Sequence, residues 1–247
     1  MFRFVIILLL LSSINVLAQS ALEVMENGGD LNVLYRNEQT FHGFIGTRGW
    51  GLGYRRGKHI TGKIKALFEI EGAYIKHPKE IKLRGGAESK GKFVYGKLNS
   101  TFLLRGGIGT QHTLFKRTER KAVEVRSTYF LEGNISFAKP YYVQILGEGS
   151  FKNTQVVKYD PLKISLDSIV GRGSFLYGFD EIKIYPAITG KYLMSIEYGN
   201  ASYKIKAIEV GIVADYYFKG LPIMAFNPAE NLIVTLQLGF VFGKKWF

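Results

Sequence analysis

Cysteine is absent from this chain of 247 residues. Its absence excludes disulfides, iron–sulfur clusters and thiol catalysis, and it leaves no residue for the attachment of a lipid anchor. Long apolar runs are also lacking after the first 18 residues, because charged residues or glycines interrupt each of them. A membrane helix needs about 20 predominantly apolar residues. We therefore expect no helical membrane span in the mature chain.

The first 18 residues have the pattern of a cleaved export signal. Arg3 precedes an unbroken apolar run at 4–11, and small or apolar residues come before Gln19. A basic start, a short apolar segment and a small residue at its end predict a signal peptide. We expect 1–18 to be removed and the mature chain to begin at Gln19.

Apolar and polar residues alternate with a period of two over most of the mature chain. In the last stretch, 231–247, bulky apolar residues hold the even positions from Leu232 to Phe242, and mostly small or polar residues hold the odd positions from Thr235 to Gly243. A period of two predicts strands. An apolar face toward lipid and a polar face toward the lumen are typical of transmembrane β-barrels. A strand of a soluble β-sandwich is the alternative for this stretch alone, and the export signal favours the barrel.

Seven segments have this strand pattern: 41–57, 62–75, 93–115, 123–137, 184–198, 204–218 and 231–247. Bacterial single-chain barrels have even strand numbers, so we infer an eighth, poorly patterned strand around 30–39. The predicted fold class is all-β, an antiparallel transmembrane β-barrel of eight strands. The barrel is assigned to 41–247, after an N-terminal segment at 19–40 that holds the inferred first strand.

Short turns and long loops divide the predicted barrel into two ends. The short turns are at 58–61, 116–121 and 199–203, and they alternate with long loops at 76–92, 147–183 and 220–231. Outer-membrane barrels have short periplasmic turns and longer external loops. We therefore place the C-terminus at the periplasmic boundary and the long loops outside, where 147–183 either caps the barrel or binds a partner. The closing aromatic residues resemble the C-terminal signal of outer-membrane proteins: Phe240, Phe242, Trp246 and Phe247.

The inward positions of the predicted strands carry charges of both signs: Glu69, Glu71, Lys97, Arg105, Glu124, Arg126, Glu132, Lys191, Glu197, Glu209 and Asp215. An eight-stranded barrel is only wide enough for side chains to fill. We expect these charges to pair in a polar core that excludes water, because a buried charge needs a partner. An ion path or an acid/base pair in the lumen is the alternative.

No catalytic, metal or cofactor site is predicted. The four histidines are scattered one to a segment, none in the spacing of metal ligands or in a recognisable pair with a serine. We interpret His77 as a solvated loop residue. A barrel-type lipid-modifying enzyme stays an alternative, and it requires a serine and a histidine within hydrogen-bond reach at the lipid interface.

Lysine and arginine outnumber the acidic residues, which gives the chain a formal net charge of +13. An exported chain does not meet nucleic acid, so we expect outer-membrane lipid and lipopolysaccharide as the counter-charge. At the short-turn end we expect the basic residues, Arg55 and Arg56 among them, to reach lipid headgroups. In the 76–92 loop the hypothesis is contact with phosphates of lipopolysaccharide or with an acidic partner, made by Lys79, Lys82, Arg84 and Lys90.

Several strings resemble an uncharacterised group of outer-membrane β-barrel proteins from Bacteroidota: GWGLGYRRGKHITGKIK, IKHPKEIK, FVYGKLNS, LLRGGIGTQ, GFDEIKIYP and the GKKWF ending. The resemblance implies fold and an outer-membrane location, and it brings no catalytic residue. Members of that phylum carry small barrels as accessory subunits of machines for barrel assembly and protein export. We therefore expect a non-enzymatic barrel with a structural or interaction role, acting as an accessory subunit with other outer-membrane or periplasmic proteins. A lipid-modifying enzyme and a small pore are the alternatives.

Overall fold

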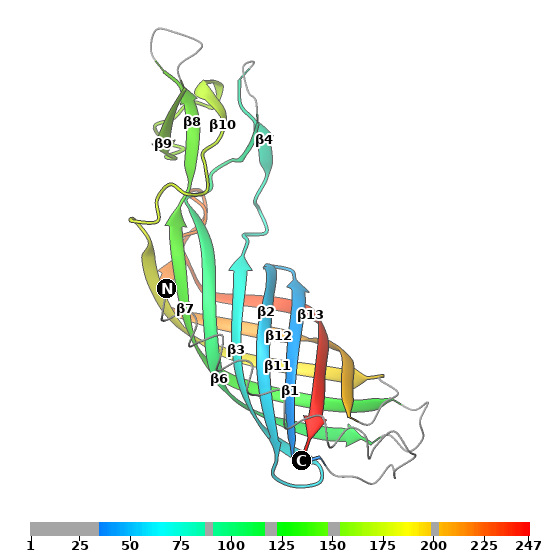
Figure 1. Ribbon diagram of the computed structural model, residues 1–247. Helices are drawn as coiled ribbons and strands as arrows, with labels where there is room; N and C mark the ends of the chain where they lie inside the picture. The colour runs from blue at the N-terminus through cyan, green and yellow to red at the C-terminus, as the bar shows by residue number, and fades with distance from the viewer. Residues whose placement is uncertain (1–34, 87–90, 117–122, 148–153, 199–202) are drawn as a thin grey trace, which may run out of the picture. The chain divides into compact units, whose positions relative to one another are not determined.

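Eight long strands form a closed antiparallel barrel in the computed structural model, which describes residues 35–86, 91–116, 123–147, 154–198 and 203–247. In chain order they are β1 (Asn37–Gly46), β2 (Gly49–His59), β3 (Ile64–Ile75), β6 (Asn99–Phe115), β7 (Glu124–Pro140), β11 (Lys183–Glu197), β12 (Lys204–Leu221) and β13 (Glu230–Trp246). Around the barrel the order is β1, β13, β12, β11, β7, β6, β3, β2 (Figure 1). The predicted eight-stranded antiparallel barrel is confirmed. The predicted signal peptide at 1–18 lies outside the described residues.

The first two strands correct the sequence prediction. The segment predicted as a single strand, 41–57, is a hairpin in which the turn residues Thr47 and Arg48 join β1 to β2. Gly49 follows the turn with a φ of 147°, and a Cβ there would lie 1.9 Å from Tyr74 O, so only glycine fits. The first strand of the described residues is therefore 37–46, which overlaps the inferred strand at 37–39, and 30–34 lie outside the described residues.

The connections away from the C-terminus form a small unit of short strands, here called the loop-end unit. It comprises β4 (Lys82–Arg84), β5 (Lys92–Val94), β8 (Tyr142–Leu146), β9 (Thr154–Lys158), the 3-10 helix η1 (Leu166–Ser168) and β10 (Ile169–Arg172). β4 pairs with β5, and β8 lies between β9 and β10. The sequence predicts loops at 76–92 and 147–183, and a barrel strand from 93. The structure corrects both, because strands of three to five residues are too short for a period of two to show.

The outer face of the barrel is apolar. On β13, Leu232 and Leu236 are each 57% exposed, whereas Ile233 between them points inward and is fully buried. The same alternation holds on β11, where Ile188 is exposed and Thr189 is buried. A continuous apolar surface of this size is unfavourable in water and suits lipid. Among the described residues, no helix is long and apolar enough to cross a membrane.

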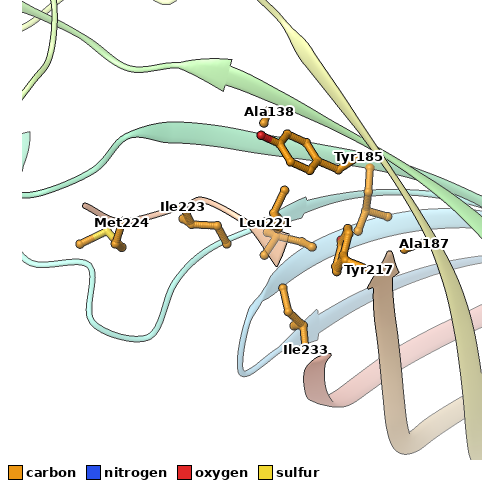
Figure 2. Close-up of a cluster of buried hydrophobic side chains, with 10 residues drawn as sticks. Ala138, Tyr185, Ala187, Tyr217, Leu221, Ile223, Met224 and Ile233 are labelled. Carbon is orange, nitrogen blue, oxygen red and sulfur yellow. The ribbon is translucent and has the colours of Figure 1, made fainter. Parts of the chain in front are cut away.

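At the long-loop end the barrel interior is filled by apolar side chains, here called the apolar plug (Figure 2). Its buried members are Ile75, Leu103, Ala138, Tyr185, Ala187, Tyr217, Leu221, Ile223, Met224 and Ile233. Met224 and Ile223 come from the connection after β12, which hydrogen-bonds to the start of β6 through Leu98 N and Ile223 O at 2.9 Å. The expectation of a polar lumen is therefore wrong at this end. Apolar residues hold both faces of the strands here, and a period of two cannot separate inside from outside.

Candidate functional site

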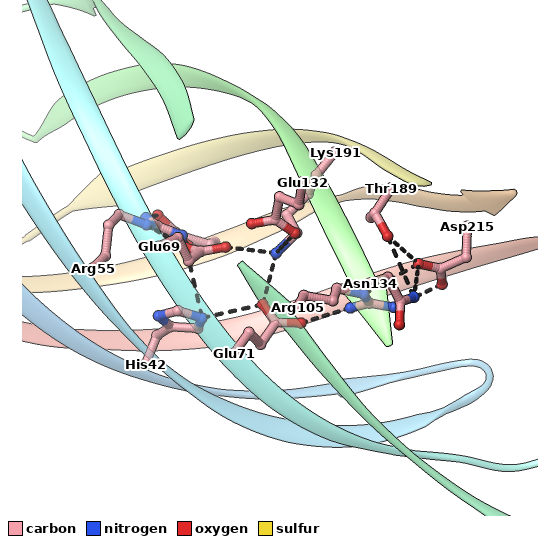
Figure 3. A network of polar contacts seen from close by, with 11 residues as sticks. His42, Arg55, Glu69, Glu71, Arg105, Glu132, Asn134, Thr189, Lys191 and Asp215 are labelled. Atoms are coloured by element: carbon pink, nitrogen blue, oxygen red, sulfur yellow. Dashed lines mark hydrogen bonds and ion pairs between the residues drawn. The ribbon is translucent and has the colours of Figure 1, made fainter. Parts of the chain in front are cut away.

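A group of buried charges in the middle of the barrel, here called the central network, surrounds Lys191 on β11 (Figure 3). Its Nζ donates to Glu69 Oε1 and to Glu71 Oε2, each at 2.6 Å, and lies 3.3 Å from Glu132 Oε2. All four side chains are fully buried. One ammonium group is thus shared by three carboxylates.

Arg105 on β6 links two further carboxylates of the central network. Its Nε and Nη2 donate to the two oxygens of Asp215 at 3.1 and 2.7 Å, and its Nη1 donates to Glu71 Oε1 at 2.6 Å. Thr189 and Asn134 also donate to Asp215 Oδ1, at 2.6 and 3.0 Å. Forked pairs of this kind are strong and directional, so they fix β12 against β3 and β6 across the lumen.

Arg55 on β2 makes a second forked pair. Its Nη1 and Nη2 donate to Glu209 at 2.8 and 3.2 Å, and its Nε donates to Glu69 Oε2 at 2.6 Å. The side chain is 4% exposed. The expectation that Arg55 reaches lipid headgroups is therefore wrong, because its position shares the inward face of β2 with Gly53.

An apolar layer separates the central network from a second group of charges at the short-turn end. The layer consists of Leu67, Phe130 and Leu193, which pack together and are at most 5% exposed. Beyond it lies what we call the end network: Glu38, Lys65, Glu124, Arg126, Glu197 and Lys245. Each carboxylate of the end network has a cation close by.

Four contacts define the end network. Lys65 donates to Glu38 Oε2 at 2.5 Å. Lys245 donates to Glu197 Oε1 at 2.8 Å. Arg126 donates to Glu124 Oε1 at 2.7 Å and also pairs with Glu197. These pairs reach partly exposed positions, since the side chains of Glu124 and Lys245 are 19% and 13% exposed.

The two networks differ in charge. The end network balances three carboxylates with three cations. The described part of the central network has three cationic side chains, Arg55, Arg105 and Lys191. It has five carboxylates: Glu69, Glu71, Glu132, Glu209 and Asp215. With all five carboxylates ionised and His42 neutral, the formal net charge of the central network is −2.

His42 belongs to the central network, and the sequence prediction missed it. Its Nε2 lies 3.4 Å from Glu71 Oε2 and 3.8 Å from Glu69 Oε2, and its side chain is 1% exposed. A single strand at 41–57 would place His42 and Gly53 on opposite faces. The hairpin reverses the chain, so both point inward and lie opposite each other. Recognition of the turn at 47–48 is the signal that would have found this residue.

Two residues lie elsewhere than the sequence predicts. Lys97 precedes β6 and does not belong to the central network. Its Nζ donates to Glu80 Oε1 at 2.7 Å and to Tyr74 Oη at 2.9 Å. His77 is 6% exposed and is not a solvated loop residue. Its Nε2 lies 3.6 Å from Glu230 Oε1. Burial lowers the pKa of His77, and the nearby Glu230 carboxylate opposes this effect.

The basic residues predicted to contact lipopolysaccharide or a partner are not all equivalent. Lys82 and Arg84 lie on β4 with exposed side chains. Lys79 donates to Asn227 Oδ1 at 2.8 Å and so ties two connections together. Lys90 lies outside the described residues. Lys82 and Arg84 are therefore the described members of this set that face solvent without a role in packing.

The aromatic residues of the C-terminal signal lie at the end of β13. Phe240 and Phe242 face outward, at 46% and 52% exposed. Asn37 Nδ2 donates to the main-chain oxygen of Phe247 at 2.9 Å, and the Phe247 ring packs against Tyr35. Trp246 lies opposite Asn37 in the pairing of β13 with β1. These contacts join the two ends of the barrel sheet, and the signal itself stays a prediction.

A closed antiparallel barrel with an apolar outer face and an interior filled by side chains defines the class of small transmembrane β-barrels. Among solved structures, the chain is similar to Neisserial surface protein A (NspA), at 9% sequence identity and a TM-score of 0.45, with 86% of this chain and 97% of that chain covered. It is also similar to Ail, the attachment invasion locus protein of Yersinia pestis, at 7% identity and a TM-score of 0.39, with 86% of this chain and 100% of that chain covered. A structure of Ail with the heparin analogue sucrose octasulfate matches at 4% identity, with a TM-score of 0.40 over the same shares. No protein-family model and no curated protein matches the chain.

Proposed function

We propose that this protein is a non-enzymatic outer-membrane β-barrel that anchors the loop-end unit, and that this unit binds another protein within an outer-membrane assembly or export complex. The observation that carries the proposal is the loop-end unit itself, which has a buried apolar core outside the barrel. The apolar outer wall and the predicted export signal support the outer membrane as its location.

The core of the loop-end unit joins two segments that are far apart in the sequence. Phe93 from β5 packs with Val143, Tyr159 and Ile169, and all four are at most 3% exposed. Full burial of such side chains contributes about 1.5 to 3 kcal/mol each. Val94 N donates to the hydroxyl oxygen of Tyr141 at 3.2 Å. A unit with a core of its own presents a fixed surface, which suits recognition of a partner.

β4 gives the loop-end unit a basic edge. It pairs with β5 on one side, and no other strand of the described residues pairs with it. The unpaired N–H and C=O groups of an edge strand can bind an extended segment of another chain. Lys82 and Arg84 are exposed on this edge, and Leu83 between them is 37% exposed. The partner that this edge suits is an extended, acidic protein segment.

The two alternatives of the sequence analysis make different demands on the structure. A lipid-modifying enzyme needs a serine bonded to a histidine. His112 and Ser127 lie opposite each other on β6 and β7, yet no hydrogen bond joins a serine to a histidine in the described part of the chain. A small pore needs an open lumen, whereas the apolar plug and the layer around Phe130 cross the interior.

The test is purification from native membranes in mild detergent, followed by identification of the proteins that accompany the chain. We expect a partner with the unmodified protein and its loss with the double variant Lys82→Glu, Arg84→Glu. The matched control is Lys163→Glu, Lys183→Glu, which makes the same charge change at exposed positions outside β4 and should keep the partner.

Three results would count against this function. A protein that arrives alone and monomeric is not an accessory subunit. If instead lipopolysaccharide accompanies the chain and only its amount falls in the β4 variant, the basic edge binds lipid phosphate and not a protein segment. Planar-bilayer conductance well above background would favour the pore.

A further inference from the structure

The central network has more carboxylates than cationic side chains in the buried interior of the barrel. Its five carboxylates and three cationic side chains leave a net charge of −2 with His42 neutral. Side chains of the apolar plug lie on one side, and the layer around Phe130 lies on the side toward the end network. Buried charges are stable only when they are paired. With every one of these carboxylates ionised, two further positive charges would bring this space to neutrality.

The atoms around His42 have the spacing of a metal site. His42 Nε2 lies 3.4 Å from Glu71 Oε2 and 3.8 Å from Glu69 Oε2, and the ligand atoms of the three residues lie within 4.8 Å of one another. Ligands at about 2.0 to 2.2 Å from a tetrahedral Zn²⁺ are about 3.3 to 3.6 Å apart. The three atoms thus surround a point that a divalent cation can occupy after small side-chain movements.

Neighbouring cations hold the two carboxylates in position. Arg55 Nε donates to Glu69 Oε2 and Lys191 Nζ donates to Glu71 Oε2, each at 2.6 Å. An ionised carboxylate oxygen accepts more than one partner, so these hydrogen bonds are compatible with a bound cation. Outer partners of this kind orient the ligands of metal sites.

Gly53 makes room for the imidazole. In the paired strands it lies opposite His42 on one side and opposite Glu71 on the other. A Cβ at position 53 would lie 2.3 Å from His42 Cε1 and 2.4 Å from His42 Nε2. The His42 ring therefore occupies the space above the glycine and reaches Glu71 across it.

Glu132 is a further buried carboxylate in the same cluster, with little positive charge beside it. The residue is 2% exposed, and neither of its carboxylate oxygens accepts a hydrogen bond from the described residues. Its ion pair is with Lys191 Nζ at 3.3 Å, which Glu69 and Glu71 already share at shorter distances. Figure 3 shows its carboxylate directed into the same cluster.

We infer that the barrel interior binds one divalent transition-metal ion through His42 Nε2, Glu69 Oε2 and Glu71 Oε2, with the Glu132 carboxylate beside it. The ion brings the central network to neutrality. An imidazole ligand favours Zn²⁺ or Fe²⁺ over Mg²⁺ and Ca²⁺, which prefer oxygen ligands alone. Because apolar side chains lie on both sides of the central network, we expect the ion to enter while the barrel folds and to exchange slowly afterwards.

The test compares metal content after two refolding reactions of the full mature chain, one with Zn²⁺ and one with EDTA, each followed by gel filtration. We expect about one equivalent of Zn²⁺ in the first preparation, retained during dialysis against EDTA and released on unfolding. Refolding with Mg²⁺ or Ca²⁺ should leave no bound ion. The unmodified protein refolded with Co²⁺ should show the visible absorption of a tetrahedral site, a readout that needs no variant.

His42→Gln and His112→Gln form the matched pair of variants, since His112 lies on the barrel wall away from the cluster. His42→Gln should lower Zn²⁺ affinity by more than about 100-fold, because loss of an outer partner alone costs about 10- to 100-fold. His112→Gln should bind like the unmodified protein. Less than about a tenth of an equivalent in the unmodified protein, or full binding by His42→Gln, would overturn the inference and leave protons as the balancing charge.

Discussion

The central network and the end network are built alike and balanced differently. Both consist of charged side chains on the inward faces of the barrel strands, and both lie beside the layer of Leu67, Phe130 and Leu193. The end network pairs each carboxylate with a cation and opens to partly exposed positions. The side chains of the central network are at most 5% exposed, and its carboxylates outnumber its cationic side chains by two.

The difference shows what position along the lumen permits. Near the mouth, water and salt screen a charge, so that an imperfect pair costs little. In the middle, the desolvation cost of each ion is several kcal/mol and has to be met by partners in the network. A sequence that keeps an excess of carboxylates at such a depth implies that something positive joins them.

The largest loss of stability is expected on removal of an arginine from the central network, and removal of an arginine from the end network is the matched comparison. Arg105→Met leaves Asp215 with Asn134 and Thr189 as donors, and it leaves Glu71 with His42 and the shared Lys191. Breaking a buried pair in this way costs about 3 to 5 kcal/mol. The measurement is the free energy of unfolding by urea in lipid vesicles, followed by tryptophan fluorescence.

Arg126→Met is the matched change in the end network. Glu38 keeps Lys65, and Glu197 keeps Lys245. We expect a loss of about 1 to 3 kcal/mol, smaller than that of Arg105→Met. Equal losses would mean that the two networks are equally screened, and the distinction between them would fail.

Alanine substitutions of glycines beside the two networks compare how far the neighbouring side chains can yield. Gly53→Ala places a Cβ 2.3 Å from the His42 ring, which is enclosed among other members of the central network. Gly57→Ala meets Glu38 Cγ and Leu67 Cδ2, each at 2.8 Å, and these belong to longer side chains near the open end. Overpacking costs about 1 to 3 kcal/mol where neighbours cannot yield, so we expect that loss for Gly53→Ala and less for Gly57→Ala. Gly190→Ala, with nothing within 4 Å of the added atom, is the control, and a loss there as large as for Gly53→Ala would contradict the explanation.

Much of the barrel could be predicted from the sequence, because a wall between lipid and lumen imposes a strict period of two. Glu69 and Glu71, for example, are placed inward by alternation with Phe68 and Ile70 alone, and burial in the structure agrees. The pairing of these residues could not be predicted in the same way. Glu69 and Lys191 are 122 residues apart, and only closure of the sheet brings their side chains together.

Three features escaped prediction for identifiable reasons. The turn at Thr47 and Arg48 lacks the Asn-Gly or Asp-Gly sequence that marks tight hairpins. Without this turn, the sequence pattern does not place His42 on the inward face. The apolar plug follows strands whose two faces are both apolar, as at Leu103 between Phe102 and Leu104. The loop-end unit depends on contacts between β5 and the distant β8 and β10 segments, which no local pattern records.

The last prediction concerns the sign of the change in the free energy of unfolding when a carboxylate is neutralised. Glu132→Gln removes one negative charge from the central network at nearly constant size, so in protein refolded with EDTA it should raise the free energy of unfolding by about 1 kcal/mol. Glu197→Gln makes the same change in the balanced end network, where it deprives Lys245 and Arg126 of a partner and should lower stability by about 1 kcal/mol. Urea unfolding of both variants beside the unmodified protein measures the two signs. Removal of an unpaired negative charge should stabilise the protein, whereas removal of a paired one should destabilise it. Destabilisation of similar size in both variants would therefore show that the charge of Glu132 is already compensated without a metal ion.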